Sequence, residues 1–282
     1  MSTGEGQDGE HADSEAPPFD TSVAHSARVY DYWLGGKDNY AADRAAAEQV
    51  IEVRPSIRTE VRANRAFLGR AVRYLTGEAG IRQFLDIGTG LPSAHNTHEV
   101  AQSIAPDSRI VYVDNDPIVL LHARALLASG PEGVTAYLNA DLREPDAILS
   151  AAAGQTLNLQ QPVAIMLVAV MHHISEQDDP GRIVARLRDA VVPGSYLVIS
   201  HPAADIETDK VAEVSRRYNA SVATGQTRRT RAEVEALFGD WEILEPGVTE
   251  TVLWRPDGPP ESTQPVPMWA AVARKPRPIR PA

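Results

Sequence analysis

Short apolar runs alternate with helix-like stretches through the middle of the chain. The helix-like stretches lie at 94–104, 117–129, 144–153 and 179–191. Continuously apolar strands that alternate with helices are typical of a parallel sheet with helices on both faces. The pattern therefore predicts an α/β fold, with strands at 83–87, 109–113, 134–138, 163–170 and 196–200.

The segment before this alternation, 21–80, has a helical pattern. One helix is predicted over 40–53, because Arg54-Pro55 ends it. A second is predicted over 56–76, where apolar residues recur at helical spacing, namely Val61, Leu68, Val72 and Leu75. Another stripe of this helix is basic and consists of Arg58, Arg62 and Arg65. We expect residues 21–80 to form a helical cap or lid.

The strand–helix rhythm ends after residue 201. Helices are predicted over 206–223 and 230–238, and the second begins with the capping-box pair Thr230 and Glu233. Two short apolar segments, 241–244 and 268–273, are expected to be strands that form an antiparallel edge on the sheet. The Rossmann-like domain would thus span 81–275. The polar residues 1–20 predict a disordered tail, and 276–282 a loose one.

Composition removes several classes of function. The chain has 282 residues, a net charge of −11 and no cysteine, so thiolate nucleophiles and zinc–thiolate sites are excluded. An acidic surface repels a phosphate backbone, so no nucleic-acid partner is expected. The N-terminus lacks the pattern of a signal peptide, and the longest strongly apolar run is about 10 residues where a membrane span needs about 20. A cytoplasmic protein without a membrane partner is expected.

A glycine-rich turn follows the first predicted strand. It contains Asp86, Gly88, Thr89 and Gly90. Glycines let the backbone approach a ligand closely, and the free N–H groups of a following helix favour polar or anionic ligand groups. The alternative is an ordinary tight turn between a strand and a helix, because a lone pair of glycines is weak evidence.

Acidic residues also end the next two predicted strands. Asp114 ends the second, at the distance where Rossmann sites bind ribose hydroxyls. Asp116, before Pro117, is better placed than Asp114 to cap the next helix. Asp141 follows the third strand and is either another cap or an acceptor for an adenine amino group. Three acids at successive carboxyl ends favour a nucleotide site.

The turn departs from two common nucleotide motifs. A dinucleotide fingerprint requires a third glycine, but Ser93 occupies that position and Pro92 stiffens the turn. The chain also has no P-loop pattern, so ATP hydrolysis of that class is not expected.

Asp86, Gly88, Gly90, Asp114 and Asp141 together resemble the motifs of class I S-adenosylmethionine (SAM)-dependent methyltransferases. The chain more narrowly resembles a bacterial S-adenosyl methyltransferase family formerly classed as a domain of unknown function. The similarity covers roughly residues 20–275 and is carried by 27–40, 62–65, 86–92, 112–117 and 194–201. Pro92 departs from the broad class but not from this narrower family.

The resemblance implies a seven-stranded, mostly parallel sheet with one antiparallel strand, a helical N-terminal cap, and SAM as cofactor. It implies no particular acceptor. The residues expected to contact the cofactor are Asp86, Gly88, Thr89, Gly90, Asp114, Asn115, Asp141, Leu142, Val168, Tyr32 and Arg65.

The N-terminal motif has a physical interpretation of its own. Tyr30, Tyr32 and Trp33 lie among charged residues, and Gly35-Gly36 permits a tight turn near a ligand. The motif is predicted to be a lid that excludes water from the cofactor site. The alternative is a packed helix hairpin with a solvated turn. Arg62, Asn64 and Arg65 are either carboxylate-binding residues or part of a solvated face.

Methyl transfer needs a general base only when the acceptor must lose a proton. Three histidines follow predicted strands and are the candidates: His172, His173 and His201. Each could instead cap a helix or bind a backbone carbonyl. No metal site is predicted, because His172 and His173 are adjacent and would point apart on an extended chain.

The sequence thus predicts transfer of a methyl group from SAM to the oxygen or nitrogen of a small molecule, with S-adenosylhomocysteine as product. A SAM-binding sensor without transfer activity is a second possibility. A nicotinamide-dependent oxidoreductase is a third, which Ser93 disfavours. The sequence predicts no oligomeric state.

Overall fold

A single mixed sheet forms the centre of the computed structural model, which describes residues 20–93, 95–119, 121, 132–259 and 264–277. Five parallel strands correspond to the predicted ones: β1 Gln83–Ile87, β2 Arg109–Asp114, β3 Val134–Asn139, β4 Ala164–Val168 and β5 Tyr196–Pro202. The α/β prediction is therefore confirmed. The predicted tail at 1–20 (except Asp20), the end of the C-terminal tail and most of the helix predicted over 117–129 lie outside the described residues.

The strand order is β3-β2-β1-β4-β5-β8-β6. β8, Met268–Arg274, runs antiparallel to β5, and two short strands pair antiparallel with β8, namely β6 Glu242–Ile243 and β7 Thr249–Glu250. The antiparallel addition is confirmed, with β7 as a strand beyond the seven expected.

From β1 the chain continues to one side through β2 and β3, then crosses to β4 on the other side. The carboxyl ends of β1 and β4 therefore form the switch point where ligands bind in such sheets.

Both faces of the sheet are buried along its central strands β1, β4 and β5, which explains their continuously apolar sequences. Successive residues of β1 point to opposite sides, so Leu85 packs in one apolar layer and Phe84 in the other. Helices α6 Pro145–Gln155, α7 Pro180–Asp189 and α9 Arg231–Ala236 cover the first face. Helices α3 Ile57–Gly77 and α4 Thr97–Ile104 cover the second.

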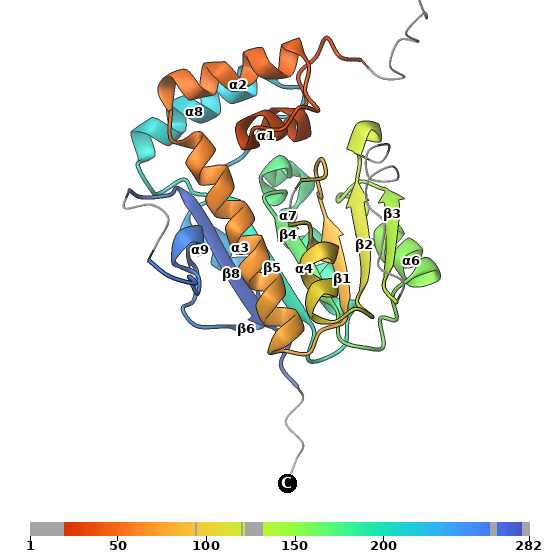
Figure 1. Cartoon of the computed structure of the whole chain (residues 1–282). Helices are drawn as coiled ribbons and strands as arrows, with labels where there is room; N and C mark the ends of the chain where they lie inside the picture. The colour runs from red at the N-terminus through yellow and green to blue at the C-terminus, as the bar shows by residue number, and fades with distance from the viewer. Residues whose placement is uncertain (1–19, 94, 120, 122–131, 260–263, 278–282) are drawn as a thin grey trace, which may run out of the picture.

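The cap consists of three helices above the carboxyl ends of the strands, joined by the start of α3 (Figure 1). They are α1 Ser26–Leu34, α2 Ala41–Val53 and α8 Thr208–Ser221. Val29, Trp33 and Val50 from the N-terminal part pack with Val214 and Tyr218 of α8. The later part of α3 instead packs on the sheet through Phe67, Val72 and Leu75. The packing therefore divides the chain within α3, not at residue 80, and adds α8 to the cap.

Local signals place several helix ends correctly. α2 ends at Val53, just before Arg54-Pro55. The capping box of α9 forms, with the Thr230 N–H donating to Glu233 Oε2 at 2.7 Å. Asp116 accepts from the Ile118 N–H at 2.9 Å, so it has the capping role predicted for it. The predicted strand 163–170 is shorter, because Ala169 leaves the extended conformation with φ of 53°.

Candidate functional site

One pocket lies at the switch point, between the strand ends and the cap. Ten of the eleven residues predicted to contact the cofactor line it: Asp86, Gly88, Thr89, Gly90, Asp114, Asn115, Asp141, Leu142, Val168 and Arg65. The carboxyl ends of parallel strands meet at one edge of the sheet, so residues far apart in sequence come together. Tyr32 is the exception, since its position is outside this lining.

The glycine turn is shaped to admit a ligand. Gly88 and Gly90 have φ of 74° and 65°, a region that residues with a Cβ rarely adopt. A Cβ on Gly88 would lie 2.2 Å from Val170 Cγ2, so this position also requires glycine for packing. A Cβ on Gly90 would meet nothing within 4 Å, so the backbone there faces open space. The turn is therefore more than a tight connection, because it opens to the pocket.

Asp86 lies at the floor of the pocket with only 5% of its surface exposed. Its Oδ2 accepts a hydrogen bond from Thr97 Oγ1 at 2.6 Å. Burial raises the pKa of the Asp86 carboxyl to about 6, although Thr97 and the charge of Arg65 partly oppose this. A cationic group in the pocket would favour the ionised carboxylate.

Asp114 holds the two loops of the site in place. Its Oδ2 accepts from the Gly90 N–H at 2.9 Å, and its Oδ1 accepts from the Asp116 N–H at 2.9 Å. Burial raises the pKa of Asp114, although these two hydrogen bonds oppose the rise. Each carboxylate oxygen retains a further acceptor position, so binding of ribose hydroxyls is compatible with this fixed geometry.

Asp141 is held at the rim by a bidentate pair with Arg143, at 2.9 and 2.8 Å. Burial raises the pKa of Asp141, but the hydrogen bonds and charge of Arg143 outweigh burial, so its pKa is lowered. Asn115 Nδ2 lies 3.4 Å from Asp141 Oδ2 and links the ends of β2 and β3. Asp141 is thus ionised at neutral pH, and it lines the same pocket as Asp86 and Asp114.

These residues suit a SAM molecule. The open backbone at Gly90, the acceptors of Asp114 and Asp141, and the buried carboxyl of Asp86 line one continuous pocket. They offer acceptors for ribose hydroxyls, for an adenine amino group and for a cationic methionine portion. When bound, SAM supplies a methyl group that its sulfonium has already activated for displacement.

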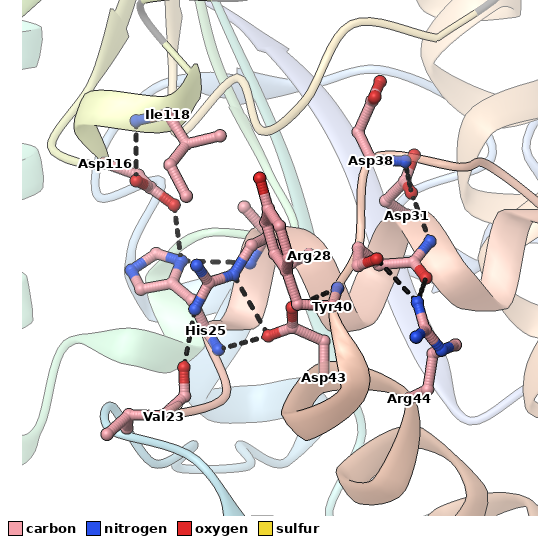
Figure 2. Close-up of polar contacts among 12 residues, drawn as sticks. Val23, His25, Arg28, Asp31, Asp38, Tyr40, Asp43, Arg44, Asp116 and Ile118 are labelled. Atoms are coloured by element: carbon pink, nitrogen blue, oxygen red, sulfur yellow. Dashed lines mark hydrogen bonds and ion pairs between the residues drawn. The ribbon is translucent and has the colours of Figure 1, made fainter. Parts of the chain in front are cut away.

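Side chains of the N-terminal motif mostly hold the cap together (Figure 2). Asp31 Oδ2 accepts from the Asp38 N–H at 3.0 Å and from Asn39 Nδ2 at 2.8 Å. A Cβ on Gly36 would lie 1.9 Å from Asp31 Oδ1, so glycine is needed beside this carboxylate. Gly35 ends α1 with φ of 88°. The motif therefore encodes the turn between α1 and α2.

A second part of this network joins the cap to the end of β2. Asp43 is fully buried and accepts from Arg28 Nε at 3.0 Å, from the His25 N–H at 2.9 Å and from the Tyr40 N–H at 2.8 Å. The His25 ring in turn lies 2.9 Å from Asp116 Oδ2, directly after β2 (Figure 2). The segment is thus the packed hairpin of the alternative interpretation, and it also forms a wall of the pocket.

The position of Tyr32 corrects its predicted role. Its hydroxyl donates to Glu48, and Arg58 stacks over its ring at 5.3 Å, so it lies on the outer side of the cap. Tyr30 lines the pocket instead. Residues two apart on a helix point in nearly opposite directions, so only one of the two tyrosines can face the site.

The arginines of the basic stripe of α3 have different surroundings. Arg65 lines the pocket and donates to His95 O and to Asn96 Oδ1, both at 3.3 Å. Arg62 is exposed, as the solvated-face alternative predicts. Asn64 is buried in the pocket wall, where its Nδ2 donates to the Tyr30 hydroxyl at 2.9 Å and its Oδ1 accepts from Ser200 Oγ at 2.6 Å.

His172 and His173 both line the pocket, on a turn of 3-10 helix after β4. The expectation that they point apart is wrong: their ring centres are 4.0 Å apart, because the chain curls after Ala169 and is not extended. Burial lowers the pKa of His173 to about 4, although a hydrogen bond with Gly225 O opposes it. Burial also holds the pKa of His172 well below its ordinary value. Both rings are therefore neutral at pH 7.

His201 lies outside the pocket lining, which argues against its predicted catalytic role. Its Nδ1 is 3.0 Å from Pro202 O and its Nε2 is 2.9 Å from Arg229 Nη1. Because a carbonyl only accepts and a guanidinium only donates, both ring nitrogens are already committed. His201 therefore has no lone pair available as a base, and the backbone-binding alternative describes it.

Some lining residues carry no recognisable signal in the sequence. His25, Gln226 and Arg228 come from the segment before α1 and the segment after α8. Thr97 reaches Asp86 from the first turn of α4. Each depends on packing between distant elements, so no local motif marks them.

Comparisons with known proteins agree with this geometry. The model of a family described as S-adenosyl methyltransferase matches residues 12–276. The chain belongs to this family. A DUF574 family protein from Streptomyces avermitilis is 46% identical over 91% of this chain and 99% of its own, with a TM-score of 0.88. A candidate methyltransferase from Thermobifida fusca is 43% identical over 94% and 100%, with a TM-score of 0.86. No curated protein matches the chain.

The protein is thus a SAM-dependent methyltransferase, with SAM as its cofactor. Family membership decides against the nicotinamide-dependent alternative. Within the described residues, no helix has both the length and the apolar character needed to cross a membrane.

Proposed function

We propose that this methyltransferase acts on the oxygen or nitrogen of a small molecule bound beneath the cap. The observation that carries the proposal is the extent of the pocket. Beyond the turn at Gly88–Gly90 it continues past Val168 to the His172–His173 pair and the inner face of α1. A protein that only sensed SAM would need no space beyond the cofactor, whereas an acceptor needs a compartment beside the methyl group.

The cofactor would lie along the strand ends. Gly88, Thr89 and Gly90 would receive the methionine and ribose portions, with Asp114 accepting from the ribose hydroxyls. Asp141, with Asn115 and Leu142, would bind the adenine. Asp86 and Arg65 would face the amino and carboxylate groups of the methionine portion, because their opposite charges complement that zwitterion.

His173 is the candidate general base. Its Nδ1 lies 3.3 Å from Gly225 O, which only accepts, so the proton is on Nδ1 and Nε2 keeps its lone pair. Nε2 would take the proton that the acceptor loses as the new bond to carbon forms. The lowered pKa of His173, about 4, keeps the ring in the proton-accepting form at all pH values above about 5. His172 packs against it and helps to fix its orientation.

The test is labelled SAM incubated with a cell extract separated into small-molecule, protein and nucleic-acid fractions. Label is expected in the small-molecule fraction only. In the His173→Gln variant, kcat is expected to fall about 10²-fold or more, the usual contribution of a general base, while the SAM Kd stays the same. The wild-type rate should show no loss between pH 8 and pH 6 from titration of His173. Label found only in protein or nucleic acid would overturn the proposal.

A further inference from the structure

Arg228 stands out among the residues that line the acceptor side of the pocket. Its Nε donates to Ser215 Oγ at 2.8 Å and its Nη1 donates to Ala203 O at 3.2 Å. A guanidinium has five N–H groups, so these two bonds leave three without a partner among the described residues. Arg228 also forms no ion pair there, although its side chain is half-buried.

The neighbouring arginine provides a direct contrast. Arg229 donates to Met171 O, to Ile174 O and twice to Glu176, and its Nη1 contacts His201 Nε2. All of its donors are used and its charge is paired. Arg229 therefore has a structural role, whereas its neighbour has donors to spare and faces the pocket.

Backbone contacts fix Arg228 close to the histidine pair. The Thr227 N–H donates to His172 O at 2.7 Å, and Gly225 O contacts the His173 ring. The chain at 225–228 thus runs alongside the turn that carries both histidines. A ligand group held by the guanidinium would be close to the candidate base.

The charge of Glu60 does not neutralise Arg228. Glu60 raises its pKa by charge, but burial dominates and lowers the pKa of Arg228 to about 10. Glu60 is itself bound by Arg54 at 2.5 Å and by Ser56 at 2.8 Å. A half-buried cation without its own counter-ion is partly desolvated, and a bound anion would offset that cost.

The rest of the compartment fits a molecule with an apolar body. Its walls include Pro202, Val214, Tyr218 and Met268, with Gln226 as a further polar group. We propose that the methyl acceptor carries a carboxylate, which the Arg228 guanidinium binds while an oxygen or nitrogen elsewhere in the molecule receives the methyl group. This rests on the proposed function, and it favours a carboxylate over a phosphate because one guanidinium balances one negative charge.

The experiment is calorimetric binding to protein saturated with S-adenosylhomocysteine. The probes are aromatic and aliphatic carboxylates, each paired with its primary amide, beginning with 4-hydroxybenzoate and 4-hydroxybenzamide. At least one carboxylate is expected to bind about tenfold or more tightly than its amide, as a charge-assisted contact would provide. In Arg228→Met this preference should disappear because carboxylate binding weakens far more than amide binding, and Arg228→Lys should keep part of the preference.

Arg62→Met is the matched control, because Arg62 is an exposed arginine outside the pocket. The Arg62→Met variant should retain the full preference for the carboxylate over its amide. The proposal is overturned if no carboxylate binds more tightly than its amide, if phosphate monoesters bind more tightly than carboxylates, or if Arg228→Met keeps the preference. A labelled methyl product that is a neutral or basic small molecule would overturn this inference but leave the proposed function standing.

Discussion

The buried carboxyl of Asp86 makes the stability of the cofactor-free protein depend on pH. Burial raises its pKa from 3.8 to about 6, and a pKa change of one corresponds to 1.36 kcal/mol. Keeping Asp86 ionised in the folded protein therefore costs about 3 kcal/mol. Asp86→Asn removes this cost and keeps an oxygen that can accept from Thr97 Oγ1. The variant should be more stable than the wild type at neutral pH.

The sign of the effect follows from the pH range over which Asp86 loses its proton in the folded and in the unfolded state. Below about pH 4, Asp86 is neutral in both the folded and the unfolded wild type, so the variant gains little. Between about pH 4 and pH 6 the unfolded chain releases the proton before the folded protein does, and wild-type stability falls. The advantage of Asp86→Asn should thus be about half developed near pH 5 and reach its full value of about 3 kcal/mol above pH 7.

The assay is urea unfolding followed by tryptophan fluorescence at a series of pH values and constant ionic strength, without SAM. Asp141→Asn is the control of opposite sign, since Arg143 lowers the pKa of Asp141 despite burial. It should destabilise the protein at neutral pH, by an amount that shrinks in acid. The reasoning is refuted if Asp86→Asn is no more stable than wild type at pH 8, or if its advantage does not shrink towards pH 5.

Two further substitutions test the turn and the cap. Gly88→Ala should abolish measurable SAM binding in calorimetry and lower the Tm, because its Cβ would lie 2.2 Å from Val170 Cγ2 at a φ of 74°; Gly154→Ala, a helical position with open space, should keep binding unchanged. Asp43→Ala should lower the free energy of unfolding by about 3–5 kcal/mol in urea titrations, because it leaves buried Arg28 without its partner. A loss below about 1 kcal/mol would contradict the cap network described above.

Much of the cofactor side of the site was predictable because its signals are local. A buried strand is a continuous apolar run, and the turn after it needs glycine for positive φ. Asp86, Asp114 and Asp141 end successive strands, and parallel strands end at the same edge of the sheet. These features depend on a few adjacent residues, so the order of the chain already determines that Gly88, Gly90 and the three acids meet.

The side of the pocket proposed to hold the acceptor was decided by tertiary structure alone. Tyr30 rather than Tyr32 faces the pocket because of the direction in which α1 packs, which its motif does not encode. His201 follows a strand like the other candidates, but Arg229 and Pro202 O occupy its ring nitrogens. Arg228 reaches the pocket only because the chain after α8 folds back onto the histidine turn.

The physical reason for this division is the range of the interactions involved. Strand periodicity, glycine turns and helix caps are set by neighbours within a few residues, so the sequence by itself determined the sheet and the edge where we propose that SAM binds. Which side chains of α1, α8 and the 225–228 segment face that edge depends on packing between elements up to about two hundred positions apart, such as Trp33 against Tyr218. Only the folded structure decides those contacts, and with them the chemistry of the proposed acceptor compartment.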